Sequence, residues 1–376
     1  MTGLHVDRRS EMEIMDGMDR RPITVSAPGR ICLFGEHQDY FGLPVIAAAI
    51  DLRIRISGSP RTDRTIHLDL PDIGETDSFS SGEELTYSKK RDYLRSAVNV
   101  LKRKGVVLSG GWNCSIRGTI PINSGTSSSS ALVVAWIRFL MESASDSRLG
   151  SPETIAEWSF ESEVAEFGEP GGKMDHYASA VGGVVNIRFG RRLEVRRFAQ
   201  QLQEFVLADS LQRKNTTGTL GFIKSHVLEG LDLIRKRLKG FRLDGPVGDE
   251  EMNEIKRLPD DIRRLLGGTL KTRDLTRQGE RLFEADVFDH ARFGKLLTLQ
   301  QEVLREDIRV STPRLDEMIG AALEAGALGA KLNGSGQGGC VFAYCPGRAE
   351  ETAEAMERLG AKPFIVHIDT GVRKES

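Results

Sequence analysis

The sequence has few of the features that mark membrane, secreted or metal-stabilised proteins. Only four of its 376 residues are cysteine, and no Cys/His spacing is typical of zinc, so we predict neither a disulfide framework nor a structural metal. No apolar run reaches the ~18 residues of a membrane span, and the longest candidate, residues 131–141, is interrupted by Arg138. The opening residues have no signal-peptide core. We therefore expect a cytoplasmic protein without a membrane partner.

The charge balance argues against a nucleic-acid-binding protein. The 52 Lys and Arg residues against 54 Asp and Glu leave a formal charge of −2, whereas nucleic-acid-binding proteins normally show a basic footprint. Glycine, in contrast, is abundant. It makes up 40 of the 376 residues, about 11%, whereas the usual share is ~7%. Because glycine lets the backbone approach a ligand closely, the placement of the glycines is the first guide to function.

The length and periodicity of the chain predict its organisation. The chain exceeds the ~250–300 residues at which one core stops growing, which predicts two packed domains. Alternation predicts strands at residues 52–56, 66–70, 112–116 and 185–189, and a period near 3.6 predicts helices at 94–101, 127–141, 152–167 and 223–238. Because strict βαβ alternation is missing, we predict an α+β fold. We expect a flexible segment over 1–21 and domains over 22–199 and 200–376.

The first informative tract is residues 27–42 (APGRICLFGEHQDYFG). Four side chains in five positions between two glycines have proton, charge or hydrogen-bonding capacity: Glu36, His37, Asp39 and Tyr40. Packing alone does not require such a cluster, whereas a polyol substrate needs a donor and an acceptor for each hydroxyl. A solvated charged turn is the alternative, and this tract by itself does not separate the two.

The second tract is residues 121–131 (PINSGTSSSSA), which lead without a gap into an apolar helix. Small hydroxyl residues before a helix leave backbone N–H groups free, and the helix dipole adds partial positive charge there. We therefore predict phosphate binding at this helix end, with hydroxyls that can also bind Mg²⁺. A Ser-rich linker is the alternative, and the buried-looking helix that follows disfavours it.

Two further glycine tracts say little about function by themselves. Residues 334–339 (GSGQGG) precede an apolar strand, and no βαβ opening surrounds them, so they are not a dinucleotide fingerprint. Residues 168–173 (GEPGGK) are similar to a P-loop. Their spacing is one residue short, however, and Met174 stands where Ser or Thr is required, so we reject that interpretation.

Two carboxylates flank the rejected tract. Glu163 lies near the end of one predicted helix, and Asp175 begins the next segment. The intervening turn can bring both to one cleft, where one would hold a metal and the other would accept a proton from a hydroxyl nucleophile. The alternative, that both face water, stays open for this pair alone.

Together, these tracts resemble the motifs of the GHMP kinases, in the order that family shows, from about residue 22 onward. Residues 29–40 (GRICLFGEHQDY) are similar to the galactokinase signature, and residues 332–340 (LNGSGQGGC) to the third family motif. The resemblance implies an N-terminal domain like the second domain of ribosomal protein S5 and a ferredoxin-like C-terminal domain. It also implies ATP and Mg²⁺ as cofactors.

The resemblance implies a role for each matching residue. Asp175 would be the catalytic base, and Arg30 would stabilise the transferring phosphoryl group. The sugar would be held by Glu36, His37 and Asp39 with the backbone near Gln38 and Gly172. The ATP phosphates would be wrapped by Asn123, Ser124, Gly125, Thr126, Ser127, Ser128 and Ser129. Mg²⁺ would be held by Ser129 and Glu163.

We therefore expect an ATP-dependent sugar kinase that phosphorylates an anomeric hydroxyl. The second tract departs from the family pattern at Asn123, Thr126 and Ser130, and position 221, where galactokinases carry a sugar-contacting tyrosine, is glycine. The sequence thus leaves the sugar open. A mevalonate kinase-like enzyme is the nearest alternative. A non-catalytic sugar sensor and an interaction protein that uses the charged residues 249–310 are further ones.

Overall fold

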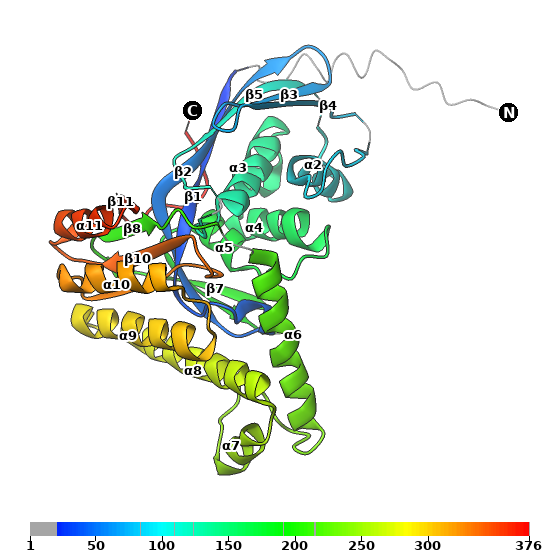
Figure 1. Ribbon diagram of the computed structural model, residues 1–376. Coiled ribbons are helices and arrows are strands. Elements are labelled where there is room, and N and C mark those ends of the chain that lie inside the picture. The colour runs from blue at the N-terminus through cyan, green and yellow to red at the C-terminus, as the bar shows by residue number, and fades with distance from the viewer. Residues whose placement is uncertain are drawn as a thin grey trace.

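A computed structural model describes residues 21–375, except positions 83, 109, 123, 191, 214 and 215. The predicted flexible segment 1–21 therefore lies, apart from Arg21, outside the described residues. The described chain forms two sheets with helices packed on them (Figure 1). None of its helices is both long and apolar enough to cross a bilayer.

The first sheet has eight strands among the described residues. Its main path runs β12-β1-β2-β5-β3-β4, and β6 joins β2 to β7. The strands are β1 (Ile23–Phe34), β2 (Val45–Arg61), β3 (Thr65–Leu70), β4 (Glu75–Ser80), β5 (Gly111–Gly118), β6 (Val184–Phe189), β7 (Leu193–Phe198) and β12 (Arg373–Lys374). The alternating segments are strands as predicted, and β3 pairs in parallel with β5.

Helices cover one face of this sheet (Figure 1). They are α2 (Tyr93–Arg103), α3 (Ser128–Ser143), α4 (Pro152–Phe160) and α5 (Met174–Val181), with a π-helical turn η3 (Glu161–Ala165) directly after α4. The helix predicted over 152–167 therefore ends its regular α-helical part at Phe160. Short 3-10 turns lie at η1 (Asp39–Phe41) and η2 (Ser147–Gly150).

The apolar first half of β2 is explained by burial on both of its faces. Val45 and Ala47 pack into the core beneath the helices. Ile46, Ala48 and Ile50 pack into a second core that is shared with the rest of the chain. A strand covered on both sides reads as a continuous apolar run rather than as an alternation, and this is why residues 45–50 lack the pattern that the later part of β2 shows.

The second sheet has the order β11-β8-β10-β9 and is wholly antiparallel. Its strands are β8 (Phe205–Asp209), β9 (Gly329–Leu332), β10 (Cys340–Tyr344) and β11 (Lys362–Val366), and it is packed by α10 (Pro313–Glu324) and α11 (Ala349–Arg358). Numbered within this sheet, the order is 4-1-3-2, with helices between the first and second and between the third and fourth strands. The predicted α+β class is confirmed, and this topology is that of a ferredoxin-like sheet.

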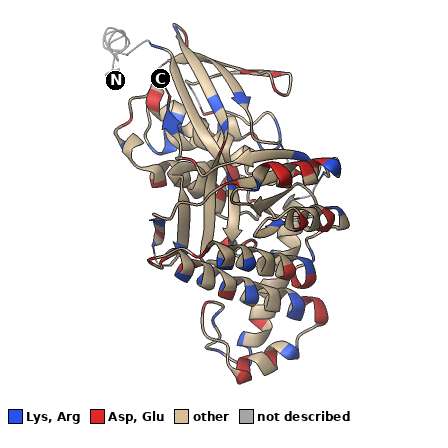
Figure 2. Cartoon of the chain, turned by 90° about the vertical axis from the view of Figure 1, so that its left-hand side faces the viewer, with Lys and Arg blue, Asp and Glu red and all other residues tan. Residues whose placement is uncertain are grey.

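A long helical segment separates β8 from α10. It contains α6 (Thr216–Arg235), α7 (Asp249–Lys256), α8 (Asp260–Phe283), α9 (His290–Glu302) and the π-helical turn η4 (Val303–Asp307). Acidic and basic residues are interspersed along these helices (Figure 2), and several form exposed pairs such as Arg263–Asp260. The charged region 249–310 is therefore a helical layer with a solvated face.

The end of the chain returns to the first sheet. β12 pairs with β1, and isolated bridges join Ile50 to Ile368 and Gly182 to Thr370. The predicted boundary between residues 199 and 200 falls between β7 and β8. That boundary stays a prediction, and the strand pairing assigns residues 373–374 to the first sheet.

A fully buried ion pair joins the turn after β1 to the second sheet. Lys331 on β9 and Glu36, just after β1, form a salt bridge with side chains that are 0% and 1% exposed. Lys331 Nζ also donates to the backbone oxygens of Cys32 (3.1 Å) and Leu332 (2.9 Å). Because each buried charge is stable only while its partner is present, this pair fixes the turn after β1 against the second sheet.

Removal of the cation should be costly. In Lys331→Met, the charge of Glu36 remains buried without its partner, and we expect a loss of about 3–5 kcal/mol in the free energy of unfolding. The double variant Lys331→Met/Glu36→Gln should recover part of this loss because no charge is left behind. Urea unfolding of both variants measures the difference. A double variant no more stable than the single one would contradict the assignment.

Two glycines on α8 provide a matched test of how β1 is seated. A Cβ at Gly279 would lie 2.6 Å from Cδ2 of Phe34, whereas a Cβ at Gly267 meets nothing within 4 Å. Gly279→Ala should destabilise the chain by roughly 1–3 kcal/mol through overpacking. Gly267→Ala should stabilise it by up to about 1 kcal/mol through helix propensity. Equal shifts of the two thermal midpoints would refute the close contact.

Candidate active site

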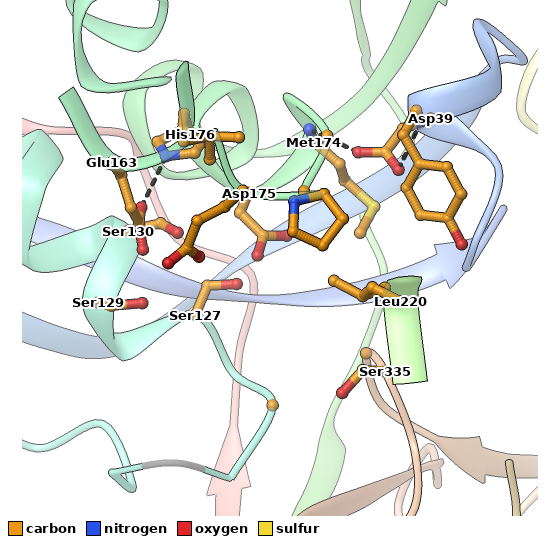
Figure 3. A pocket seen from close by; sticks show the side chains of 18 of the residues that line it. Asp39, Ser127, Ser129, Ser130, Glu163, Met174, Asp175, His176, Leu220 and Ser335 are labelled. Atoms are coloured by element: carbon orange, nitrogen blue, oxygen red, sulfur yellow. Dashed lines mark hydrogen bonds and ion pairs between the residues drawn. The ribbon is translucent and has the colours of Figure 1, made fainter. Parts of the chain in front are cut away.

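A cavity with a volume of about 230 Å³ lies where the predicted motifs converge (Figure 3). Its walls come from the end of β1 and the turn after it, the start of α2 and the segment before it, and the start of α3. The segment from η3 to α5, the start of α6 and the loop between β9 and β10 complete them. The three motif tracts therefore meet at one place, although they are far apart in sequence.

Arg30 and Asp175 form the centre of the site. Arg30 Nε donates to Asp175 Oδ1 at 2.8 Å, and the Arg30 side chain is 4% exposed. Arg30 Nη1 donates to the backbone oxygen of Gly125 at 2.5 Å. One guanidinium thus joins the predicted base to the predicted phosphate-binding tract, and the two residues to which the resemblance assigns catalytic roles are in direct contact.

The environment of Asp175 keeps it ionised. Burial by itself would raise its pKa, but the charge and hydrogen bond of Arg30 outweigh burial, and the Ser127 hydroxyl adds to them, so the pKa of Asp175 lies below its usual value. A carboxylate that is charged at neutral pH can accept a proton from a hydroxyl placed next to it.

Asp39 is a second carboxylate on the same cavity wall. Its Oδ2 accepts from the Met174 backbone N–H at 3.2 Å, and its Oδ1 accepts from that of Tyr40 at 3.0 Å. Burial first and the charge of Asp175 second raise the pKa of Asp39 to about 6. A Cβ at position 172 would lie 1.8 Å from Asp39 Oδ2, so Gly172 is needed for this carboxylate to sit there.

The other predicted sugar-binding residues divide into two groups. Glu36 and His37 line the cavity, and His37 Nδ1 lies 3.2 Å from the Tyr40 hydroxyl. Gln38 does not line the cavity. Its side chain is buried and donates to the backbone oxygen of Pro44 and to Thr276 Oγ1 at 3.1 Å, and it thereby fixes the turn on which its neighbours stand.

The predicted phosphate-binding tract is also divided between residues that line the cavity and residues that support the loop. The cavity is lined by Gly125, Ser127, Ser128 and Ser129. Ser127, the N-cap residue of α3, has a left-handed φ of 61°, and its side chain accepts no hydrogen bond from the helix. The first backbone N–H groups of α3 are therefore not capped by this side chain. Ser124 and Thr126 point into the loop, where their hydroxyls lie 2.9 Å apart. Asn123 lies outside the described residues.

The predicted metal ligands face the same cavity. Ser129 stands in the first turn of α3, and Glu163 stands in the π-helical turn η3. Among the described residues, no group of three or more His, Cys, Asp or Glu side chains could hold a metal by itself. Mg²⁺ that arrives with a nucleotide needs only one or two protein ligands besides the phosphates, and a hydroxyl with a carboxylate fits that requirement.

Several lining residues were not predicted. His176 and Ser335 belong to tracts that the sequence drew attention to, whereas Arg91, Tyr93 and Leu220 carried no signal. Arg91 binds Glu169 through two hydrogen bonds and also donates to Thr217 at the start of α6. Leu220 lines the cavity, whereas Gly221, at the position that is compared with the galactokinase tyrosine, does not.

Family models match three parts of the sequence. The model of the GHMP kinases N-terminal domain matches residues 92–183, and that of the GHMP kinases C-terminal domain matches residues 281–362. The galactokinase galactose-binding signature matches residues 16–60. The last match contains Arg30 and the turn with Asp39.

Several kinases are similar to this protein along nearly the whole chain. Mevalonate kinase of Pyrococcus furiosus is 32% identical over 359 residues, which are 92% of this chain and 96% of that protein. Galactokinase of Thermococcus kodakarensis is 28% identical over 351 residues, 90% of this chain and 94% of that one. The crystal structure of Lactococcus lactis galactokinase complexed with galactose has the same fold, with a TM-score of 0.81 at 22% identity and coverage of 97% and 98%.

The two domain models and the relatives that exceed 30% identity agree with the converging motifs. The chain belongs to the GHMP kinases.

Proposed function

We propose that the protein is an ATP-dependent sugar kinase that transfers the γ-phosphoryl group to the anomeric hydroxyl of a neutral sugar. The observation that carries the proposal is the Asp39 carboxylate, which faces the acceptor side of the cavity next to Asp175. A sugar hydroxyl is a good partner for such a group because it donates a hydrogen bond and carries no charge.

The charges around Asp39 favour a neutral acceptor over an anionic one. Three other carboxylates of the cavity each have a basic partner: Glu36 with Lys331, Asp175 with Arg30, and Glu169 with Arg91. The described residues include no salt bridge to Asp39. A substrate that carries its own carboxylate would meet the charge of Asp39 at close range, and like charges that are poorly solvated repel each other.

The neighbours of Asp39 are suited to a polyol. Tyr40 and His37 line the same wall, and burial raises the pKa of Tyr40 well above its usual value, so that its hydroxyl stays protonated. An ionised carboxylate accepts hydrogen bonds only, whereas a tyrosine hydroxyl both donates and accepts. The wall therefore supplies both kinds of partner that vicinal hydroxyls need.

The proposed reaction uses groups already aligned. Asp175 accepts the proton of the acceptor hydroxyl while the hydroxyl oxygen forms a bond to the γ-phosphorus, and the bond from that phosphorus to the bridging oxygen of ADP breaks. Arg30 balances the charge that builds on the phosphoryl oxygens. The start of α3 binds the phosphates. Mg²⁺, when bound by Ser129 and Glu163, supplies further charge neutralisation.

A mevalonate kinase is the second candidate. The similarity of the P. furiosus mevalonate kinase, at 32% identity, favours it. Lys224, whose Nζ lies 5.5 Å from the centre of the Tyr40 ring, is a cation near the acceptor wall that a substrate carboxylate could approach. The negative charge of Asp39 disfavours this candidate, because mevalonate carries a carboxylate.

ADP release with Mg-ATP against a panel of acceptors tests the function. The panel is galactose, glucose, arabinose, N-acetylhexosamines, glucuronate and mevalonate. We expect release with a neutral sugar and a loss of about 10²–10⁴-fold in kcat in Asp175→Asn, because the general base is removed while the shape is kept. Asp260→Asn, an exposed change, is the control and should match the unaltered protein.

Two outcomes of the panel would overturn the sugar proposal. Release with mevalonate alone would assign the second candidate. No release with any acceptor, together with sugar and ATP binding in calorimetry, would indicate a sensor rather than an enzyme. An Asp175→Asn variant with an unchanged kcat would refute the assignment of the base.

The raised pKa of Asp39 predicts a pH dependence of sugar binding. Asp39 is ionised above about pH 6, so it accepts sugar hydroxyls fully at pH 7–8 and loses this capacity as the pH falls. The KM for the sugar should rise by about tenfold at pH 5, one unit below that pKa. Asp39→Asn should have a high KM that no longer changes with pH. A variant that keeps the same pH profile would exclude Asp39 as the titrating group.

A further inference from the structure

A buried histidine binds the carboxylate that is proposed to hold Mg²⁺. His176 Nε2 lies 2.7 Å from Glu163 Oε2, and the two side chains are 2% and 8% exposed. Figure 3 shows the two joined by a hydrogen bond on the wall that faces Ser129. His176 follows the proposed base directly in sequence but bonds to a different partner.

Among the described residues, the imidazole ring of His176 makes no hydrogen bond other than the one to Glu163. The edge of the ring packs against Phe160, with ring centres 5.7 Å apart. His176 Nδ1 is buried and has no hydrogen-bond partner among the described residues. The bond to Glu163 therefore requires the proton on Nε2, which donates to the carboxylate.

Glu163 needs such a partner because of its position. It stands in the π-helical turn η3, a local departure from α-helical geometry that is often found at functional sites. Its Oε2 is taken by His176, and its Oε1 accepts no hydrogen bond from another described residue. A hydrogen bond to one oxygen restricts rotation of the carboxylate and leaves the other oxygen for a cation.

We propose that His176 is a positioning residue that orients Glu163 for a divalent cation bound with the nucleotide. Metal-binding carboxylates are commonly held by hydrogen bonds of this kind, and loss of the partner typically weakens metal binding by about 10–100-fold. The proposal rests on the magnesium site in the proposed function and is independent of which acceptor the enzyme uses.

A purely structural role makes a different prediction. If His176 only fills space next to Phe160, any side chain of similar size should serve, and metal binding should follow the stability of the fold. If the donated hydrogen bond matters, a side chain whose N–H reaches Glu163 should retain metal affinity, and a shorter amide should lose it.

Two amide variants separate these roles. The amide nitrogen of glutamine reaches about as far as Nε2 of histidine, whereas that of asparagine reaches only about as far as Nδ1. Mn²⁺ replaces Mg²⁺ as the probe, and the affinity for Mn²⁺ with ADP is measured by electron paramagnetic resonance without any acceptor. We expect His176→Asn to weaken Mn²⁺ binding by about 10–100-fold and His176→Gln to stay within about threefold of the unaltered protein.

Two controls make the result specific. ADP affinity in EDTA should be equal in all variants because the metal is absent. Phe160→Leu, which changes the packing of the ring without touching Glu163, should retain Mn²⁺ affinity. Equal Mn²⁺ affinities of His176→Asn and His176→Gln would overturn the proposal. Because the readout contains no acceptor, a failure of the sugar kinase assignment would leave this result unaffected.

Discussion

The guanidinium of Arg30 is the contact on which the arrangement of the site depends. It binds Asp175 and the backbone oxygen of Gly125, while Asn333 Nδ2 donates to that same Gly125 oxygen at 3.0 Å and Asn333 Oδ1 accepts from the Cys32 N–H at 2.9 Å. These bonds connect the three motif tracts through strand β1. A buried cation must be paired and hydrogen-bonded to be tolerated, so a displacement of Asp175 or of the Gly125 loop would remove one of the two partners of Arg30.

The same requirement explains how the cavity keeps several carboxylates. Lys331 compensates Glu36 from the second sheet, and Arg91 compensates Glu169 from the segment before α2. Asp39 differs, since it is held by backbone N–H groups rather than by a cation. Among the described residues it forms no salt bridge, and it is therefore the group through which the site would distinguish a neutral acceptor from an anionic one.

Backbone features place these side chains as much as the side chains themselves do. Gly172 lets the loop before α5 pass over Asp39, and the π-helical turn η3 directs Glu163 towards His176. Gln38, Ser124 and Thr126 act one step away from the cavity, because their side chains hold the turns that carry lining residues. A motif thus contains both residues that can touch a ligand and residues that shape the loop.

The sequence by itself determined the local features. It predicted the α+β class, most strands and helices, and a candidate phosphate site before α3, because periodicity and glycine placement are properties of neighbouring residues. A shared site for Arg30 and Asp175, in contrast, was implied only by the family resemblance. Only the tertiary structure decided which residues share a wall. Arg91 reaches Thr217 across 126 positions, Lys331 reaches Glu36 across 295, and β3 lies parallel to β5. Such contacts depend on how the two sheets pack, and no local pattern encodes that packing.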